Sequence, residues 1–318
     1  MAGLILERTE DDLTAKTRIC AVYGHPIHHS ASPPMQNAGM RHLGLPWRYA
    51  AFDVRPEDLR QALEGATAMR FAGINLTVPH KLLAMDMVDV LDETAREWGA
   101  VNTVVFEGRD ENGVWRPLGL MEPGSTRDVR RVGHNTDADA IERAIREAFA
   151  LRCLEGLSVL LLGAGGAARA AALRLARERL ASIHLINRTR EKAETLAAEI
   201  RERHPETEVR TDYPSGSVDL LINGTSLGLK EADGLPFDGG CFELRRAVRV
   251  YDMMYRPPET RLLREAKLAG CEVSNGLGML LYQGARALEL WTGRTAPVDV
   301  MGEALRRAVL PAGKALAP

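Results

Sequence analysis

The stretch from Val159 to Ala170 constrains the fold of this chain more than any other. An apolar run ends at Gly163-Ala164-Gly165-Gly166-Ala167, and an Ala-, Leu- and Arg-rich segment at helical spacing follows from Ala170 to Leu180. The pattern predicts a strand, a tight turn and a helix, with glycines in the G-x-G-x-x-G/A arrangement. We therefore expect a dinucleotide-binding unit, although Gly-rich turns also end strands that bind no ligand.

Each small residue of this turn has a separate expected role. Gly163 permits the turn, Gly165 lets a pyrophosphate approach the backbone, and Ala168 lets the helix pack on the strand. The free N–H groups at the start of the helix would then favour an anion.

The next predicted strand, Ser182 to Asn187, completes a βαβ unit and ends in a cationic segment. An NAD-binding fold usually places an acid here to hold the ribose 2′-hydroxyl, but this chain has Asn187-Arg188-Thr189-Arg190 and then Lys192. We interpret these cations as a clamp for the 2′-phosphate of NADP, the alternative being a solvated helix start. One charge-assisted contact contributes about 1.5–3 kcal/mol. NADP should therefore be preferred over NAD by roughly one to two decades.

Length and charge narrow the class of protein. The 318 residues suggest two domains, and 45% hydrophobic with 26% charged residues indicates a globular chain with sizeable cores. The balance of 41 basic and 43 acidic residues gives no reason to expect a nucleic-acid or membrane partner. Four scattered cysteines are interpreted as reduced, buried thiols of a cytoplasmic protein. From their charge and short apolar patch, we expect residues 1–18 to be neither a signal peptide nor a membrane span.

Polar side chains gather at predicted strand ends in the N-terminal half. A loop after the strand Ile19 to Gly24 carries Ser30 and Ser32, which either bind a ligand or cap the following helix. Its histidines have no metal-ligand spacing, so we expect no metal.

A second such corner follows the strand that begins near Phe71. It carries Asn75, Thr77 and Lys81, and a helix is expected to continue from Leu82 to Leu91. A further strand from Trp98 to Val105 would bring in Asn102 near its start. A lone lysine at such a position is otherwise a solvated charge.

The connection from Glu107 to Val132 is polar and is predicted to form a hairpin or an extended loop. Asp137 then precedes a helix from Ala138 to Phe149, where capping is its ordinary role. Further on, strands at 218–226 and 248–255, a helix at 260–269 and long helices from Gly276 alternate in a way that predicts a parallel α/β protein.

Eight segments in register, from about Val22 to Gly293, resemble the shikimate dehydrogenase family with its shikimate and quinate dehydrogenases. They are His29-Ser30-Ala31-Ser32-Pro33, Asn75-Leu76-Thr77-Val78-Pro79-His80-Lys81, Gly99-Ala100-Val101-Asn102-Thr103, Asn135-Thr136-Asp137, Gly163-Ala164-Gly165-Gly166-Ala167, Asn187-Arg188-Thr189, Asn223-Gly224-Thr225-Ser226 and Gln283-Gly284. Any one is weak, whereas the ordered set is specific.

The resemblance implies an α/β fold of two domains. Residues 1–136 with 277–318 would form a substrate domain completed by C-terminal helices, and residues 137–276 a Rossmann-type NADP-binding domain. The implied reaction is the reversible NADP-dependent reduction of 3-dehydroshikimate to shikimate, in aromatic amino acid biosynthesis.

The resemblance also implies roles for single residues. Lys81 and Asp137 match the catalytic pair, and Met253 and Gly276 lie near the nicotinamide. The implied substrate contacts are Ser30, Ser32 and Tyr255 for the carboxylate, and Asn75, Thr77, Asn102 and Gln283 for the ring. The implied cofactor contacts are Gly163, Ala164, Gly165, Gly166, Ala167, Asn187, Arg188, Thr189, Lys192, Thr225, Met253 and Gly276.

The implied chemistry is consistent with the residues present. Interconverting a secondary alcohol and a ketone requires hydride transfer and a proton, and a cation can stabilise the developing alkoxide without a metal. A neighbouring carboxylate favours the charged form of Lys81. We therefore expect Lys81 to act mainly as proton donor during reduction, with Asp137 orienting it.

Some positions depart from the family pattern and leave alternatives open. Gln36 stands where a His is common, and Ala138 where a Gly is common. Ser32 in place of Gly leaves little room for the extra hydroxyl of quinate, which favours shikimate. A quinate or aminoshikimate dehydrogenase using NAD or NADP, and a non-catalytic ligand-sensing regulator, remain alternatives. The expected partner is a small cyclohexene carboxylate, and a homodimer is left open.

Overall fold

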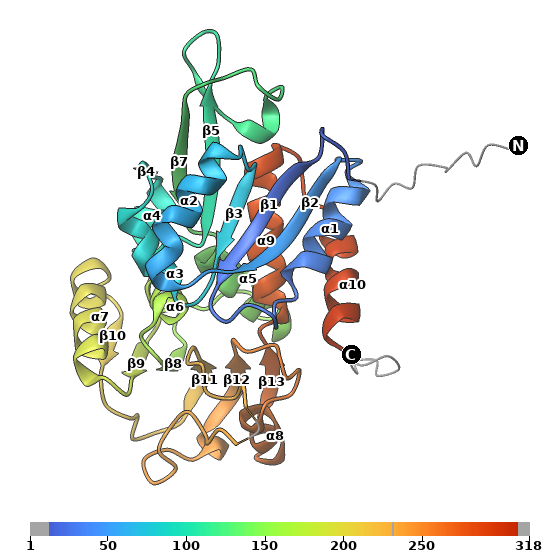
Figure 1. Cartoon of the computed structure of the whole chain (residues 1–318). Coiled ribbons are helices and arrows are strands. Elements are labelled where there is room, and N and C mark those ends of the chain that lie inside the picture. The colour runs from blue at the N-terminus through green and yellow to red at the C-terminus, as the bar shows by residue number, and fades with distance from the viewer. Residues whose placement is uncertain (1–12, 231, 311–318) are drawn as a thin grey trace, which may run out of the picture.

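The computed structural model describes residues 13–230 and 232–310, which form two β-sheets with helices packed around them (Figure 1). Most of the N-terminal segment interpreted above, and the last residues of the predicted substrate domain, therefore lie outside the described residues. The first sheet contains the strands from β1 to β7, and the second contains those from β8 to β13.

The first sheet has the order β2-β1-β3-β5-β7-β4, with β6 paired to β5. Its strands are β1 (Arg18–Gly24), β2 (Trp47–Asp53), β3 (Gly73–Leu76), β4 (Val90–Leu91), β5 (Thr103–Arg109), β6 (Trp115–Pro117) and β7 (Val129–His134). The expected parallel arrangement is wrong for part of this sheet, because β5 pairs antiparallel with β3, β6 and β7. The short connection through β6 is the predicted hairpin, and it returns the chain without a crossover helix.

Helices from both ends of the chain cover the first sheet. They are α1 (Ser32–His42), α2 (Leu59–Ala68), α3 (His80–Leu83), α4 (Glu93–Trp98), α9 (Leu277–Thr292) and α10 (Val298–Val309). Trp291 of α9 is fully buried and its Nε1 donates to the Val104 carbonyl oxygen at 3.1 Å. A Cβ on Gly73 would lie 1.9 Å from that nitrogen, so a glycine is required there. The C-terminal helices thus pack on the N-terminal sheet, as predicted (Figure 1).

The second sheet has the order β10-β9-β8-β11-β12-β13 and is parallel throughout. Its strands are β8 (Ser158–Leu162), β9 (Ser182–Ile186), β10 (Glu208–Arg210), β11 (Val218–Asn223), β12 (Ala247–Asp252) and β13 (Glu272–Asn275). The remaining helices are α5 (Asp137–Ala148), α6 (Gly166–Ala176), α7 (Arg190–Arg203) and α8 (Arg261–Leu268). Short 3-10 turns occur at Pro56–Asp58, Ala84–Asp86, Leu118–Leu120 and Leu244–Arg246.

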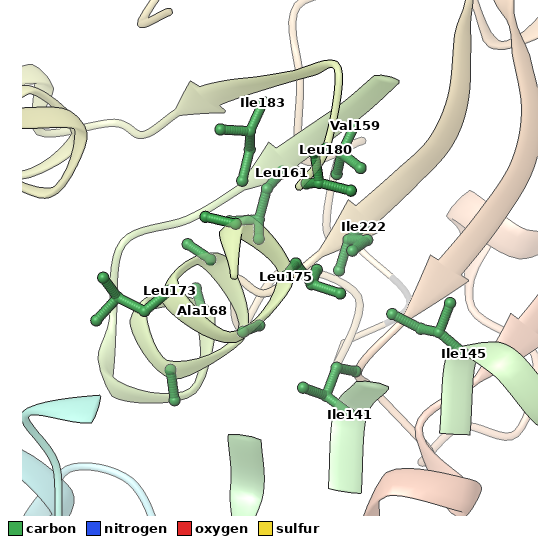
Figure 2. Packing of buried hydrophobic residues seen from close by; sticks show 14 of the residues in the cluster. Ile141, Ile145, Val159, Leu161, Ala168, Leu173, Leu175, Leu180, Ile183 and Ile222 are labelled. Carbon is green, nitrogen blue, oxygen red and sulfur yellow. The ribbon is translucent and has the colours of Figure 1, made fainter. Parts of the chain in front are cut away.

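The core of this second unit lies between β8, β9, β11 and the helices α5 and α6. Figure 2 shows Val159 and Leu161 of β8 with Ile183 and Ile222 of the neighbouring strands, packed toward Ile141 of α5. Central strands of a parallel sheet are buried on both faces, which explains the uninterrupted apolar run before the Gly-rich turn.

Two local predictions are wrong. The helix expected from Leu82 to Leu91 ends at Leu83, because the backbone of Asp89 bonds to Arg131 and β4 joins the edge of the sheet at β7. Trp98 is not in a strand but ends α4, and Gly99 follows it with a φ of +63° as a left-handed helix cap. Tertiary pairing overrides local spacing in the first case, whereas local caps at Asp92 and Gly99 define the helix in the second.

The prediction of buried thiols is half right. Cys20 and Cys271 are buried, whereas Cys153 and Cys241 are exposed, because they lie in connections outside the strands and helices. Within the described residues, no helix has the length and hydropathy that crossing a membrane requires.

Candidate active site

A cavity of about 300 Å³ lies where the carboxyl ends of strands from both sheets approach each other. It brings together side chains and turns that are far apart in the chain. Among its lining residues are the predicted site residues Ser30, Ser32, Asn75, Thr77, Lys81, Asp137, Ala167, Thr225, Met253, Tyr255, Gly276 and Gln283. A cavity of this size and mixed polarity suits a small polar molecule.

Lys81 and Asp137 form an ion pair in this cavity. The Lys81 Nζ lies 2.6 Å from Asp137 Oδ2, and their side chains are 13% and 3% exposed. Lys81 comes from α3 and Asp137 from the start of α5, so the fold joins two residues 56 positions apart. A charge-assisted hydrogen bond in a nearly dry site is strong and fixes both groups.

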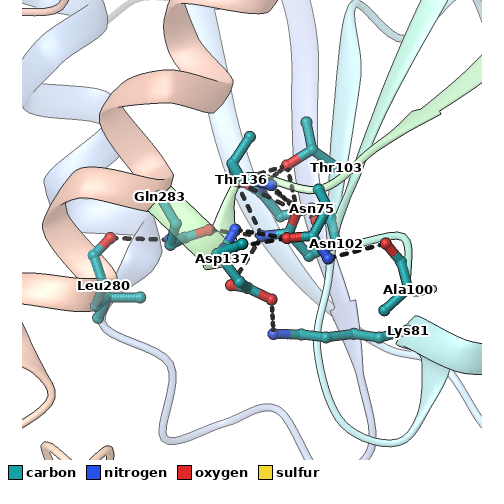
Figure 3. A network of polar contacts seen from close by, with 11 residues as sticks. Asn75, Lys81, Ala100, Asn102, Thr103, Thr136, Asp137, Leu280 and Gln283 are labelled. Carbon is teal, nitrogen blue, oxygen red and sulfur yellow. Dashed lines mark hydrogen bonds and ion pairs between the residues drawn. The ribbon is translucent and has the colours of Figure 1, made fainter. Parts of the chain in front are cut away.

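The second carboxylate oxygen of Asp137 is held by Asn102. Figure 3 shows the side-chain amide of Asn102 beside Asp137 and Thr136. The Asn102 Nδ2 donates to Asp137 Oδ1 at 2.9 Å. The Asn102 Oδ1 accepts the Thr136 backbone N–H at 2.7 Å. Asn102 is 1% exposed and is not among the cavity-lining residues. Its position is therefore behind Asp137, and its predicted contact with a substrate ring stays a prediction.

Asn135 takes over the capping that was expected of Asp137. Its Oδ1 accepts the backbone N–H groups of Asp137 and Ala138 at 3.0 and 3.2 Å. Because Asn135 satisfies these helix-start donors, the carboxylate of Asp137 is free for Lys81. The capping role of Asn135 could have been suspected from its type and position, but several polar residues there competed for it.

Asn75 and Gln283 are also fixed by neighbours. Asn75 Oδ1 accepts from the Tyr49 hydroxyl at 2.8 Å, and its Nδ2 donates to Thr103 Oγ1 at 3.0 Å. Gln283 Nε2 donates to the Leu280 carbonyl oxygen at 2.8 Å. The parts of Tyr49 and Thr103 were missed from the sequence, because strand residues give no local signal of which partner they will face.

The hydroxyl groups of Ser30, Ser32 and Tyr255 line another part of the same cavity. Neither serine occupies the cap position of α1, which is Ala31, but the Ser30 Oγ accepts the backbone N–H of Ser32, the first residue of α1, at 3.3 Å. Burial raises the pKa of Tyr255, against hydrogen bonds from the Ala31 backbone and Ser30 that lower it. The hydroxyls of Ser30 and Tyr255 are thus close neighbours.

The departure at Gln36 does not reach the cavity. The Gln36 side chain is fully buried and its Nε2 donates to the Gly284 carbonyl oxygen at 2.8 Å, joining α1 to α9.

The Gly-rich turn has the geometry expected for a dinucleotide site. Gly163 has a φ of +107°, and a Cβ on Gly165 would meet nothing within 4 Å. Ala168 is fully buried, and a Cβ on Gly224 would lie 2.7 Å from the Ala168 Cβ. The turn, the open approach to the backbone and the close packing of helix on strand are all present, so the residues fit a pyrophosphate.

This turn faces the ion pair. A Cβ on Gly166, the first residue of α6, would lie 3.4 Å from the Lys81 Cβ. On the other side, a Cβ on Gly276 would lie 2.0 Å from the Met253 carbonyl oxygen, which requires a glycine. Thr225 is fixed by the Asn223 Oδ1, which accepts from its hydroxyl at 2.8 Å.

The cationic segment lies beyond the cavity, at the carboxyl end of β9. Asn187 and Arg190 line a separate, open depression of about 580 Å³ there. Arg190 pairs with Glu194 at 2.7 Å, whereas Arg188 and Lys192 are exposed and have no acidic partner among the described residues. Thr189 is the residue before α7, and its carbonyl oxygen accepts the Asn187 Nδ2 at 2.7 Å. The depression and the unpaired cations are compatible with a phosphate-bearing ribose.

In the part of the chain that the structure describes, no three His, Cys, Asp or Glu side chains come together in a group able to hold a metal ion.

Known proteins resemble this chain over most of its length. A family model described as shikimate dehydrogenase substrate binding domain matches residues 22–104, and others described as shikimate / quinate 5-dehydrogenase and shikimate 5'-dehydrogenase C-terminal domain match residues 146–226 and 276–306. A curated shikimate dehydrogenase (NADP(+)) from Desulforamulus reducens is 40% identical over 93% of this chain and 97% of its own. The chain belongs to the shikimate dehydrogenase family.

Solved structures share the fold. Shikimate 5-dehydrogenase from Thermus thermophilus, in complex with NADP(H) and shikimate, has a TM-score of 0.74 at 34% identity, covering 92% of this chain and 99% of that one. The ligand-free 5-ketofructose reductase of a Gluconobacter species has a TM-score of 0.71 at 34% identity, with 92% and 99% covered. The fold is therefore shared by proteins named for an acidic and for a neutral substrate.

Proposed function

We propose that this chain catalyses the reversible reduction of 3-dehydroshikimate to shikimate with NADP as cofactor. The observation that carries the proposal is the Lys81–Asp137 ion pair, 2.6 Å across and nearly dry, beside the Gly-rich turn. The names of the relatives support both the substrate and the cofactor.

The Gly-rich turn, the ion pair and Asn102 have separate roles in the proposed reaction. NADPH, when bound at the Gly163–Ala167 turn, supplies the hydride. The Lys81 ammonium donates a proton to the ketone oxygen as that oxygen gains negative charge. Asp137 holds the ammonium in place and Asn102 holds Asp137, so little reorganisation is needed when the substrate arrives.

The other cavity residues bind and orient the substrate in this proposal. Ser30, Ser32 and Tyr255 offer hydroxyl donors to the carboxylate, and Asn75, Thr77 and Gln283 contact the ring hydroxyls. Thr225, Met253 and Gly276 would hold the nicotinamide side of the cofactor. Arg188 and Lys192, with Asn187 and Thr189, would hold its 2′-phosphate.

Initial rates measured with shikimate or quinate, each with NADP or NAD, test this proposal on one preparation. Fast turnover with shikimate and NADP and slow turnover with quinate are the expected results, because the Ser32 side chain lines the cavity and would meet the extra hydroxyl of quinate. Quinate turnover would contradict the role of Ser32 and leave the reaction type in place. No turnover in any combination would overturn the proposal in favour of a ligand-sensing role.

A second candidate function is reduction of a neutral keto sugar, favoured by the likeness to 5-ketofructose reductase. Assaying 5-ketofructose with NADPH beside 3-dehydroshikimate separates the two. We expect the acid to be reduced far faster.

We further propose a cytoplasmic enzyme without a nucleic-acid or membrane partner, since the charge of the chain is nearly balanced. A homodimer is part of the same proposal. Sedimentation equilibrium across a range of protein concentrations tests it, and a mass of one chain throughout would contradict it.

A further inference from the structure

Arg256 lines the cavity but has no part in the function described so far. It follows Tyr255 in the loop after β12 and is half-buried. Its Nη1 donates to the His29 carbonyl oxygen at 3.2 Å, and its Nη2 donates to the Ala308 carbonyl oxygen at 2.8 Å. The guanidinium therefore extends from the second sheet to the loop that carries Ser30.

Arg256 retains hydrogen-bonding capacity. A guanidinium has five N–H donors, and the two bonds to carbonyl oxygens leave three of them. No carboxylate in residues 13–230 or 232–310 forms an ion pair with it. Arginine is well suited to carboxylate recognition because its fork matches the two oxygens.

The charge of Arg256 is unbalanced within the cavity. The other fully charged lining residues are Lys81 and Asp137, which neutralise each other at 2.6 Å. His29 adds no further positive charge, since burial and then the Arg256 charge lower its pKa and so favour the neutral ring. The same guanidinium acts on the Tyr255 hydroxyl, where its charge opposes the effect of burial on the pKa. The positive field therefore lies at the end of the cavity that holds Ser30 and Tyr255.

We propose that Arg256 is a specificity-determining cation, which selects substrates with a carboxylate at the Ser30 and Tyr255 end of the cavity over neutral substrates of the same shape. This inference rests on the proposed function, because it uses the carboxylate position assumed there. It adds a charged partner to hydroxyl groups that alone would accept a neutral ligand.

A purely structural role predicts something different. If Arg256 only ties the His29 loop to α10, its loss would weaken binding of acidic and neutral ligands equally. If its charge selects the carboxylate, loss would affect the acid alone, and the effect would shrink as salt screens the field.

The test compares kcat and KM for shikimate and for its methyl ester, with saturating NADP, at low and high salt. The variants are Arg256→Gln, Arg256→Lys and Arg264→Gln. Arg264 is the matched control, since it is exposed, lies outside the cavity lining and also donates to a carbonyl oxygen, that of Glu259 at 3.2 Å.

We expect Arg256→Gln to raise the KM for shikimate on the order of tenfold. Its kcat, and its KM for the methyl ester, should stay within about twofold of the wild-type values. Arg256→Lys should restore most of the preference for the acid because it keeps the charge, and Arg264→Gln should match the wild type. An unchanged KM for shikimate in Arg256→Gln, or an equal rise in the KM for shikimate and for its methyl ester, would overturn the inference about Arg256 and leave the proposed function in place. A wild-type protein without turnover of shikimate would overturn it together with the proposed function. If Arg256→Gln fails to fold, the salt dependence of the wild-type KM and the Lys variant decide the question.

Discussion

Both carboxylate oxygens of Asp137 already have partners inside the protein, whereas Arg188 and Lys192 lie in solvent without an acidic partner among the described residues. The first region is dry, and its geometry is fixed by Asn102 and Asn135 from neighbouring elements. The second region consists of two long, exposed side chains that form no ion pair within the described residues. The proposed proton-transfer group is thus organised before any ligand binds, while the proposed phosphate clamp would form only on binding.

This difference has an energetic meaning. Preorganised charges need no reorganisation during the reaction, so they act on the rate of the chemical step. Flexible surface cations lose side-chain entropy when they meet a phosphate, so they act on affinity and on the choice of cofactor. Substitutions at the Lys81–Asp137 pair should therefore lower kcat, whereas substitutions at Arg188 and Lys192 should raise the KM for the cofactor.

The largest expected effect comes from Lys81→Ala. Removing the proton donor should lower kcat about 10²- to 10⁴-fold, the usual contribution of a positioned acid or base, and leave the KM for NADP nearly unchanged. Steady-state rates across a pH series measure it. A variant whose kcat profile kept the height and shape of the wild type would contradict the assignment of Lys81.

The second-largest effect is expected at Asp252, a buried acid at the end of β12 in the sheet that carries the Gly-rich turn. Burial raises its pKa to about 6, against hydrogen bonds from Thr260, the Met254 backbone and Asn223 that lower it. In the unfolded chain the pKa of this carboxyl group is about 3.9. Between these values the folded protein holds a proton that the unfolded chain releases. The contribution of Asp252 to stability is therefore present below about pH 4 and is lost as the pH rises through about 6.

Asp252→Asn tests this sign. We expect the free energy of unfolding of the wild type, relative to the variant, to fall by about 2 kcal/mol between pH 4 and pH 7. Urea unfolding of both proteins across that range measures it, and effects of all other groups cancel in the difference. A difference that stays constant with pH would show that the nucleotide side has no such buried, titrating group.

The smallest effect is expected from Arg188→Gln. Loss of one charge-assisted contact of about 1.5–3 kcal/mol should raise the KM for NADP roughly ten- to a hundredfold, with the KM for NAD and kcat unchanged. Arg190→Gln is the matched control, because Arg190 already pairs with Glu194 and should change either KM less than about twofold. Equal effects of both substitutions on NADP and NAD would show that the segment attracts the cofactor only by general charge.

Sequence spacing predicted local features well where the signal is local. The turn at Gly163 needs a positive φ, and the small Ala168 is required by the packing of α6 on the sheet, so both were readable from residue type alone. The helix expected from Leu82 failed because pairing of β4 with β7 lies outside any local window. For the same reason the antiparallel direction of β5 was not foreseen, although a strand was expected to reach Val105.

The candidate site divides in the same way. The resemblance to a family placed Lys81 and Asp137 in one site, but no spacing in the chain states that they touch. The roles of Asn135 as the helix cap and of Tyr49 as the partner of Asn75 emerged only when distant strands met. Arg256 gave no motif at all, since its significance depends on which charges share its cavity.

Short stretches of the chain were enough to predict the Gly-rich turn, the lack of an acid directly after β9 and the order of the polar segments, because turn geometry and charge at a strand end are properties of a few adjacent residues. The folded protein was needed to show which carboxylate oxygen faces Lys81, which amide supports it, and which cation is left unbalanced. Those outcomes depend on burial and on contacts between elements far apart in the chain, which fix distances and remove water.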